Sequence, residues 1–233
     1  MRLFMMSALL MMAICAAGHA QVPDRVELDG FAIDAHEVTI AAFERHVAAR
    51  NLRTAAEREG GGFEFAGGWT RRPGWTFRRP SGQAGAPNDP VSHVSWAEAR
   101  EYCTAIGGRL PSAAEWRRAA YTEMREMPTD GFERGRTYAY PVGNAPAGMN
   151  LSSGDRWERQ SQIGLTRRGV NGLYDMGGNV WEWLADRRGT EALTAGGSWW
   201  YGPSQTQSES MQWKAADFYA VYVGFRCAYD PGP

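Results

Sequence analysis

Residues 172–186 read Gly-Leu-Tyr-Asp-Met-Gly-Gly-Asn-Val-Trp-Glu-Trp-Leu-Ala-Asp, and this stretch decides how the rest of the chain is interpreted. Its Gly-Gly pair favours a sharp turn, because glycine adopts backbone conformations that other residues avoid. The residues after the turn alternate in character, so a strand would place Trp181 and Trp183 on the face opposite Glu182. The sequence therefore predicts a turn that leads directly into a strand with an aromatic face.

Two oxygen-bearing side chains follow the glycine turn. Asn179 and Glu182 lie three residues apart, where their oxygens and freed backbone carbonyls can converge on a hard cation such as Ca²⁺. The alternative is that the turn simply leads into a core strand, with both side chains hydrogen-bonded to nearby backbone. Composition alone favours this second interpretation.

The composition is that of an ordinary globular protein. Of the 233 residues, 43% are hydrophobic and 22% are charged, which is enough apolar material for one well-buried domain. The formal net charge of −1 provides no electrostatic basis for binding nucleic acid or an anionic membrane surface. We therefore expect neither kind of partner.

The first twenty residues have the pattern of a secretory signal peptide. A basic residue precedes an apolar run over residues 3–17, and small residues precede an expected cleavage after Ala20. A lipoprotein would use Cys15, but the bulky Ile14 before it fits that pattern poorly. The apolar run is short for a membrane span, and no second one follows. We expect a mature chain of residues 21–233 that is exported, periplasmic or secreted, without a membrane span.

Export changes what the cysteines indicate. Cys15 leaves with the signal peptide, so the mature chain keeps two cysteines, Cys103 and Cys227. An even pair in an oxidising compartment indicates one disulfide. The alternative, two buried free thiols, is less expected outside the cytosol.

Local sequence signals predict a mixture of strands, short helices and long loops. Residues 31–38 alternate as a strand does, and Thr39 is a candidate N-cap for the helix that follows. Residues 95–98 and 112–115 each form a capping box, in which a serine and a glutamate satisfy the first backbone N–H groups of a helix. The aromatic and β-branched segment 218–229 is typical of a buried terminal strand. These signals predict one irregular, loop-rich α+β domain.

Several motifs occur in the order seen in one enzyme superfamily. They are Phe31-Ala-Ile-Asp-Ala-His-Glu-Val-Thr39, Pro90-Val-Ser-His-Val-Ser-Trp-Ala-Glu-Ala99, Gly108-Arg-Leu-Pro-Ser-Ala-Ala-Glu-Trp116, the stretch Gly172 to Trp183, Gly196-Gly-Ser198 and Gly224-Phe-Arg-Cys227. Together they resemble the formylglycine-generating enzyme (sulfatase-modifying factor) superfamily over residues 26–230, nearly the whole mature chain. The resemblance implies a single formylglycine-enzyme-like domain, a fold related to that of C-type lectins.

The resemblance also implies a disulfide and a calcium site. In the family, a cysteine in the helix before Gly-Arg-Leu-Pro pairs with the cysteine of Gly-Phe-Arg-Cys, which implies a bridge between Cys103 and Cys227. Asn179 and Glu182, with the carbonyl of Val180, match a family calcium site. Ca²⁺ is therefore the cofactor that we expect, if any is present.

A further calcium site of the family uses an asparagine in the loop before the central stretch. Asn150 and the carbonyl of Leu151 match its position. The carboxylate that completes this site in the family is not clearly present, because Asp155 comes too soon after them.

The positions that carry the family's oxidase chemistry differ in this chain. Members that convert cysteine to formylglycine have two cysteines shortly after Gly-Gly-Ser and bind Cu(I), the soft metal that thiolates select. The matching positions hold Tyr201 and Thr206, and neither side chain is a soft thiolate ligand. We therefore expect no copper and assign no catalytic residue.

Aromatic residues near these two positions form a predicted ligand pocket. The candidates are Trp199, Trp200, Tyr201 and Trp213. Such a pocket would suit a planar or apolar ligand held by stacking. The alternative is that these aromatic side chains complete the core.

Three functions remain compatible with the sequence. The first is an exported binding or accessory protein that holds an unidentified polypeptide or small molecule. The second is a divergent periplasmic oxidoreductase, similar to the pyoverdine-maturation members of the superfamily, which act without that cysteine pair. The third is a variable ligand-binding protein of a diversity-generating retroelement, a class that shares this fold. We favour the first.

Overall fold

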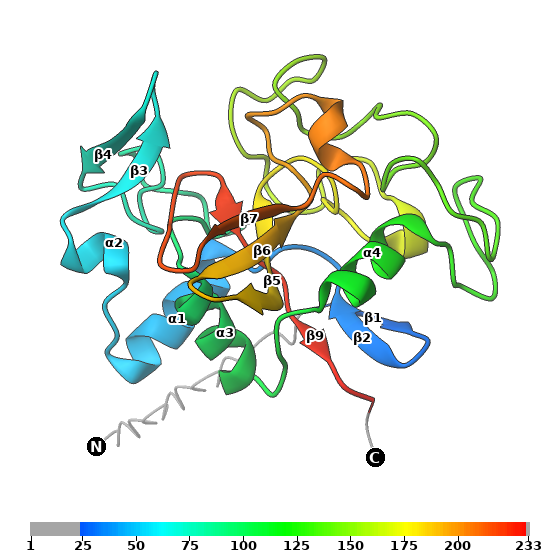
Figure 1. The fold of residues 1–233 in the computed structure, drawn as a ribbon, viewed down its shortest axis with the longest axis horizontal. Coiled ribbons are helices and arrows are strands. Elements are labelled where there is room, and N and C mark those ends of the chain that lie inside the picture. The colour runs from blue at the N-terminus through cyan, green and yellow to red at the C-terminus, as the bar shows by residue number, and fades with distance from the viewer. Residues whose placement is uncertain (1–23, 232–233) are drawn as a thin grey trace, which may run out of the picture.

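A computed structural model describes residues 24–231 as a mixed domain of short strands, few helices and long loops (Figure 1). This architecture confirms the predicted irregular α+β class. The predicted signal peptide, residues 1–20, lies outside the described residues. Within the described part of the chain, no helix is long and apolar enough to cross a membrane.

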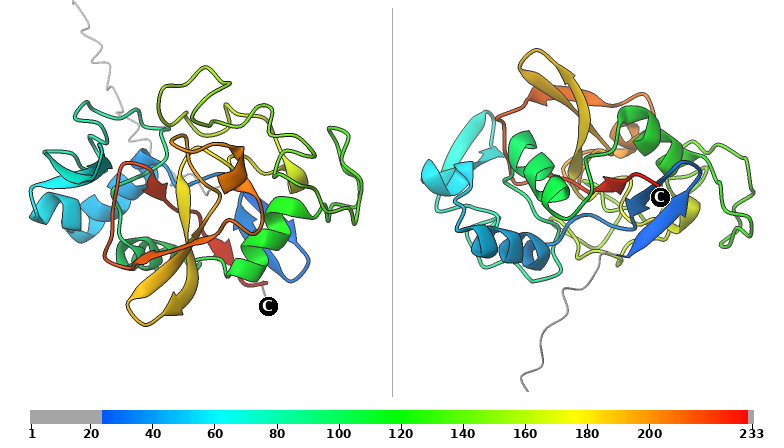
Figure 2. Two further views of the ribbon diagram at one scale, coloured as in Figure 1. Left: turned by 45° about the horizontal axis from the view of Figure 1, so that its top comes forward. Right: turned by 90° about the horizontal axis from the view of Figure 1, so that it is seen from below.

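The described strands form three small sheets. Strands β1 (Arg25–Leu28), β2 (Phe31–Asp34) and β9 (Ala228–Tyr229) form an antiparallel sheet, and β3 (Gly61–Phe65) and β4 (Trp69–Pro73) form a hairpin. The central sheet has the order β7 (Gln212–Ala215), β6 (Glu191–Ala195), β5 (Trp181–Arg188) and β8 (Val223–Gly224), with β8 parallel to β5. The last two strands belong to different sheets, so the C-terminal segment runs through the middle of the fold (Figure 1, Figure 2).

Side-chain caps fix where the helices begin. The helices are α1 (Ile40–Arg50), α2 (Ala55–Arg58), α3 (Trp96–Ala105) and α4 (Ala113–Tyr121), with short 3-10 helices η1 (Val170–Gly172) and η2 (Pro203–Thr206). Thr39 caps α1, and the predicted capping boxes of Ser95 and Ser112 begin α3 and α4. A further capping box, Thr54 with Glu57, begins α2. Its Thr-Ala-Ala-Glu sequence is the same signal and predicts this helix equally well.

Strand β5 lies between two hydrophobic clusters. Trp181 and Trp183 belong to the larger cluster, with residues of α1, α3 and the C-terminal segment. Leu184 belongs to the second cluster, with Trp116 of α4. The predicted placement of both tryptophans on one face is therefore confirmed. Because α3 and α4 both pack against β5 (Figure 1), the strand that follows the glycine turn is the centre of the core.

The C-terminal segment is buried as predicted, but it is not one continuous strand. The strand predicted over residues 218–229 is instead two short strands, β8 and β9, which pair with different sheets. Gly224 approaches Val91 so closely that a Cβ atom would lie 2.4 Å from the Val91 carbonyl oxygen. The apolar composition predicted burial correctly, whereas the change of partner sheet is a tertiary effect that no local pattern contains.

A disulfide between Cys103 and Cys227 joins α3 to the C-terminal segment. Both cysteines are fully buried in the larger cluster, and the predicted pairing is present. The two residues are 124 positions apart in sequence. The bridge therefore closes a long loop and restricts the unfolded chain strongly.

Reducing this disulfide should lower the free energy of unfolding by about 3–5 kcal/mol, because the reduced unfolded chain regains the entropy of a long open loop. Urea unfolding of the mature protein with and without reductant measures the difference. The double variant Cys103→Ala, Cys227→Ala should unfold like the reduced protein. Two titratable thiols in the unfolded but unreduced protein would contradict the pairing.

A network at the surface joins the start of α4 to the end of the chain. Arg109 donates to the two carboxylate oxygens of Glu115 at 2.7 and 2.8 Å and to Asp230 at 2.8 Å. The Ser112 hydroxyl and N–H also donate to Glu115. Partial burial raises the pKa of Glu115, but the hydrogen bonds from Arg109 and Ser112 outweigh it and hold the pKa at about 2.

This network should make the protein lose stability in acid. The pKa of Glu115 is lower in the folded than in the unfolded chain, so its contribution is present above about pH 4.5 and is lost as the pH falls toward 2. Glu115→Gln should lower the free energy of unfolding by about 1–2 kcal/mol at pH 7 and by much less at about pH 2.5. Urea titrations at the two pH values measure this.

A matched control is the exposed ion pair between Glu126 and Arg134. Glu126→Gln should change the free energy of unfolding by less than about 0.5 kcal/mol at either pH. Equal losses for Glu115→Gln at both pH values would show that its charge does not stabilise the fold.

Candidate functional site

A buried ion pair occupies the centre of the domain. Glu182 of β5 and Arg226 of the C-terminal segment are both fully buried, and Arg226 Nη2 lies 2.7 Å from Glu182 Oε1. Arg226 Nε also donates to the carboxylate, and Trp116 Nε1 donates to Glu182 Oε2 at 2.7 Å. Both oxygens of Glu182 therefore have nitrogen donors. A calcium ion would have to take the place of a guanidinium, so Glu182 does not fit the role of a calcium ligand in this arrangement.

Asn179, the other predicted side-chain ligand, is also engaged with protein atoms. Its backbone is left-handed (φ 51°) directly after the glycine turn. Its Oδ1 atom accepts hydrogen bonds from the Ser161 N–H at 2.8 Å and from Asn150 Nδ2 at 3.1 Å. Its Nδ2 atom donates to Glu37 Oε2 at 3.1 Å. The side chain thus links three segments of the core.

The two predicted calcium sites are neighbours in space. The carbonyl of Asn150 accepts the N–H of Asn179 at 3.0 Å. Asn150 Oδ1 is buried and has no hydrogen-bond partner among the described residues. Leu151 donates its N–H to Asp155 Oδ2, so Asp155 orders a local turn. The incomplete site therefore offers one free side-chain oxygen.

Taken together, these donors do not fit Ca²⁺ at the set Asn179, Val180 and Glu182. Within residues 24–231, no group of three or more histidine, cysteine, aspartate and glutamate side chains is placed to hold a metal ion. The contacts favour the alternative interpretation of the sequence, in which Asn179 and Glu182 stabilise the core through hydrogen bonds. Calcium binding stays a prediction that would require Arg226 to move.

The positions that match the family's cysteine pair lie in different environments. Thr206 ends η2 and is fully buried, and its hydroxyl donates to the Pro203 carbonyl at 2.8 Å. Tyr201 is half-buried, and its ring centroid lies 5.7 Å from that of Trp181 and 5.9 Å from that of Tyr222. Thr206 therefore belongs to the core, whereas Tyr201 borders an aromatic surface.

Tyr201 is part of a continuous series of aromatic rings, which we call the aromatic track. Its members are Phe65, Trp69, Phe218, Tyr222, Tyr201 and Trp181, and each ring centroid lies 4.8–5.9 Å from that of at least one other member. Phe65 and Trp69 are 40% and 48% exposed, and Trp181 is fully buried. The β3–β4 hairpin stands beside the loop that joins β7 to β8 (Figure 1), where Val221 donates its N–H to the Phe63 carbonyl at 3.0 Å. This contact joins the exposed end of the track to its buried end.

The predicted pocket of four aromatic residues is divided between separate places. Trp199 and Trp200 border a surface cavity of about 350 Å³, with ring centroids 5.2 Å apart. Tyr201 belongs to the aromatic track, and Trp213 packs on the second core cluster. Its neighbour on β7, Lys214, lies over the Trp181 ring of the track. Because adjacent residues of a strand point to opposite faces, Trp213 points away from the track. The expectation of one shared pocket is therefore corrected.

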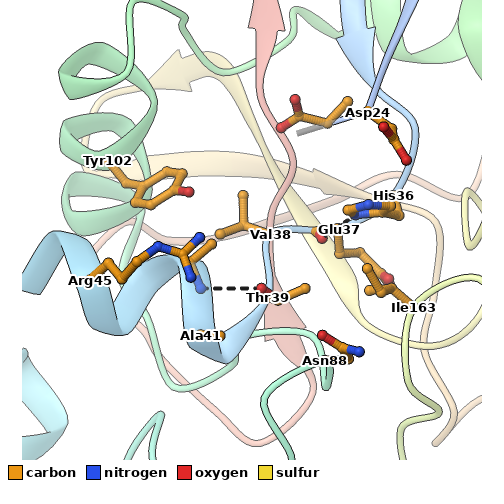
Figure 3. A pocket seen from close by; sticks show the side chains of 12 residues that line it. Asp24, His36, Glu37, Val38, Thr39, Ala41, Arg45, Asn88, Tyr102 and Ile163 are labelled. Carbon is orange, nitrogen blue, oxygen red and sulfur yellow. Dashed lines mark hydrogen bonds between the residues drawn. The ribbon is translucent and has the colours of Figure 1, made fainter. Parts of the chain in front are cut away.

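A small polar cavity lies at the connection between β2 and α1 (Figure 3). Its volume is about 120 Å³, and its lining includes Glu37, Thr39, Arg45, Asn88 and Tyr102. Glu37 is fully buried, and its Oε1 atom has no hydrogen-bond partner among the described residues. Burial, and then the charges of Asp175 and Glu182, raise the pKa of Glu37 well above its usual value. Local sequence signals predicted only a strand over residues 31–38 and no cavity. The sequence feature that could have drawn attention to Glu37 is the motif of residues 31–39, which contains it.

The two roles considered for Glu182, partner of Arg226 or calcium ligand, predict different effects of the substitution Glu182→Gln. Glu182→Gln leaves Arg226 buried without a counter-charge, so the free energy of unfolding should fall by about 3–5 kcal/mol. Melting temperatures of the wild type and of the variant should each be the same in EDTA and in excess calcium. Glu191→Gln, which removes an exposed ion pair with Arg188, should cost less than about 0.5 kcal/mol.

The opposite result would be that EDTA lowers the melting temperature of the wild type but not that of the Glu182→Gln variant. That result would establish Glu182 as a calcium ligand. If the variant is too unstable to purify, the response of the wild type to EDTA decides between the two roles.

The chain matches one protein family over almost its whole length. Residues 9–231 match the family described as sulfatase-modifying factor enzyme 1-like domain. The formylglycine-generating enzyme of Thermomonospora curvata is 30% identical, over 88% of this chain and 84% of that enzyme. The inactive C-alpha-formylglycine-generating enzyme 2 of Mus musculus is 28% identical, over 89% of this chain and 77% of that protein.

A solved structure agrees on the fold. PvdO from Pseudomonas aeruginosa superposes with a TM-score of 0.63 at 21% identity, over 86% of this chain and 80% of that chain. At this identity the likeness concerns the fold alone. On the family match and the bacterial relative, the chain belongs to the sulfatase-modifying factor enzyme 1-like domain family.

Proposed function

We propose that this chain is an exported, ligand-binding member of its family, which holds an extended polypeptide segment on the aromatic track. The observation that carries the proposal is a series of six rings that runs from an exposed hairpin to the buried end of the central sheet. Tryptophan and tyrosine bury a large area while immobilising few rotatable bonds. The exposed end of the track places two large aromatic rings, Phe65 and Trp69, at the surface, and exposed apolar side chains that lie together are typical of an interaction site.

The spacing of the rings suits an extended chain. Neighbouring centroids lie 4.8–5.9 Å apart, and alternate side chains of an extended segment are about 6.6 Å apart. Trp200, which directly precedes Tyr201, is 38% exposed and borders the neighbouring cavity. A further exposed aromatic side chain therefore directly precedes Tyr201 in the sequence.

The proposal excludes copper-dependent oxidation of cysteine. The chain has three cysteines; two form the disulfide, and Cys15 lies in the predicted signal peptide. Cu(I) selects soft sulfur ligands, and the phenol of Tyr201 is a hard oxygen donor. A relative whose name calls it an inactive formylglycine-generating enzyme supports a role of this kind within the family.

Removing an exposed ring of the track should weaken binding. Peptides selected from a random phage-displayed library on the immobilised mature protein provide the probe. For these peptides, Trp69→Ala should raise the Kd at least about 10-fold, because aromatic anchors contribute most to such interfaces. Met127→Ala is the matched control, since Met127 is 85% exposed and lies outside the track; it should change the Kd less than about 2-fold.

Equal Kd values for the wild type and Trp69→Ala would place the binding site elsewhere. The copper-loaded protein can also be incubated with a Cys-containing sulfatase peptide and oxygen. An aldehyde found on that peptide by mass spectrometry would overturn the proposed function and favour an oxidoreductase.

A further inference from the structure

The small polar cavity between β2 and α1 takes no part in the proposed binding of a polypeptide. Its volume is about 120 Å³, which is room for about four water molecules. Its lining residues come from other parts of the chain than the six rings of the aromatic track. The cavity is therefore a separate place at which a small ligand can bind.

One side of the cavity carries a positive charge and a free hydroxyl group. Arg45 of α1 and Tyr102 of α3 lie together on this side (Figure 3), and the charge of Arg45 acts on the Tyr102 hydroxyl. Tyr102 is 4% exposed, and its hydroxyl has no hydrogen-bond partner among residues 24–231. The ion pairs of α1 in this range use Glu44 and Arg50 and leave Arg45 free. Both groups can therefore bind an anion.

The first turn of α1 adds to this preference. Thr39, Ala41 and Ala42 line the cavity, and the N-terminal end of this 11-residue helix carries a partial positive charge. Its first N–H groups are already bonded within the protein, so the helix end attracts an anion through its dipole alone. The hydrogen bonds to such an anion would come from Arg45 and Tyr102.

The opposite side of the cavity carries carboxylates. Asp24 and Glu37 lie there, with His36 between the strands and the helix (Figure 3). Glu37 is fully buried; its Oε2 atom accepts from Asn179, and its Oε1 atom has no partner in the described part of the chain. A buried acceptor without a donor is costly. A hydrogen-bond donor on a ligand would therefore stabilise this side.

A positive charge on that donor would correct a shortage of positive charge in the core. Glu37, Asp175 and Glu182 all act on the single guanidinium of Arg226. An ammonium group next to Glu37 would supply a second positive charge to these three carboxyl groups and favour the ionised form of the nearest one. The two sides of the cavity thus attract opposite charges.

We propose that this cavity binds a small zwitterion, an α-amino acid of the size of glycine or alanine, with its carboxylate at Arg45 and Tyr102 and its ammonium group at Glu37. The two charged groups of such a molecule are attached to one carbon atom, so it meets both sides of a small cavity at once. A carboxylate alone or an amine alone would leave the groups of one side without a partner.

Calorimetric titration of the mature protein with ligands of matched size tests the two ends separately. Glycine should bind with a Kd below about 1 mM. Glycolate keeps the carboxylate but has a hydroxyl group in place of the ammonium group, and glycinamide keeps the ammonium group but has no carboxylate. Each should bind at least about 10-fold more weakly than glycine, because a hydrogen bond between charged groups is lost. Tryptophan should also bind at least about 10-fold more weakly, because the cavity has no room for its side chain.

Variants assign each end of the ligand to its residue. Arg45→Gln should raise the Kd of glycine at least about 10-fold but that of glycinamide less than about 2-fold, because glycinamide has no carboxylate to lose a contact. Glu37→Gln should likewise weaken the binding of glycine and leave that of glycolate unchanged. Arg50→Gln, on the same helix and outside the cavity, is the matched control and should change each Kd less than about 2-fold. Arg45 and Arg50 are exposed, so these two variants should fold even if Glu37→Gln does not.

The proposal would be overturned if glycine showed no saturable binding, or if glycine, glycolate and glycinamide had equal Kd values. A Kd for glycine that Arg45→Gln leaves unchanged would overturn it as well. Trp69→Ala, which should weaken peptide binding to the aromatic track, should leave glycine binding unchanged. The two proposals therefore fail separately.

Discussion

The ion pair between Glu182 and Arg226 is the interaction on which the rest of the structure depends. It joins β5 to the C-terminal segment, and the same guanidinium donates to the carbonyls of Asp34 and Tyr174 at 3.1 and 2.8 Å. One buried side chain therefore connects the first sheet, the stretch around the glycine turn and the central sheet. Because burying a charge costs several kcal/mol, the pair is stable only when all these partners are in place.

The charges around this ion pair are not balanced. Glu37, Asp175 and Glu182 all act on the single guanidinium of Arg226. Burial raises the pKa of Asp175 to about 6, and burial together with the charges of Asp175 and Glu182 raises the pKa of Glu37 well above its usual value. One positive charge cannot balance three carboxylates, so at least one of them keeps a proton well above the pH at which exposed carboxyl groups ionise. These buried groups stabilise the fold through their hydrogen bonds to one another.

The sequence alone predicted two kinds of feature correctly: those that depend on residues close together in the chain, and the disulfide, for which few cysteines are available. The capping boxes of Ser95 and Ser112 depend on residues three positions apart, and Cys227 was the one partner left for Cys103 after the predicted signal peptide was set aside. The calcium assignment of Glu182 depended instead on a partner 44 residues away, which no local pattern contains. The same reason explains why the predicted terminal strand divides between two sheets and why the four residues of the predicted aromatic pocket lie in three parts of the fold.

The two positions that match the family's cysteine pair differ in their surroundings. Two thiolates must face each other to share one metal ion. Thr206, however, is fully buried and bonded to the Pro203 carbonyl, whereas Tyr201 lies in the aromatic track. Neither side chain supplies the soft sulfur ligand that Cu(I) selects. Trp181 and Tyr222 of the aromatic track belong to the same hydrophobic cluster as Cys103 and Cys227, so the buried end of the track is part of the core that the disulfide stabilises.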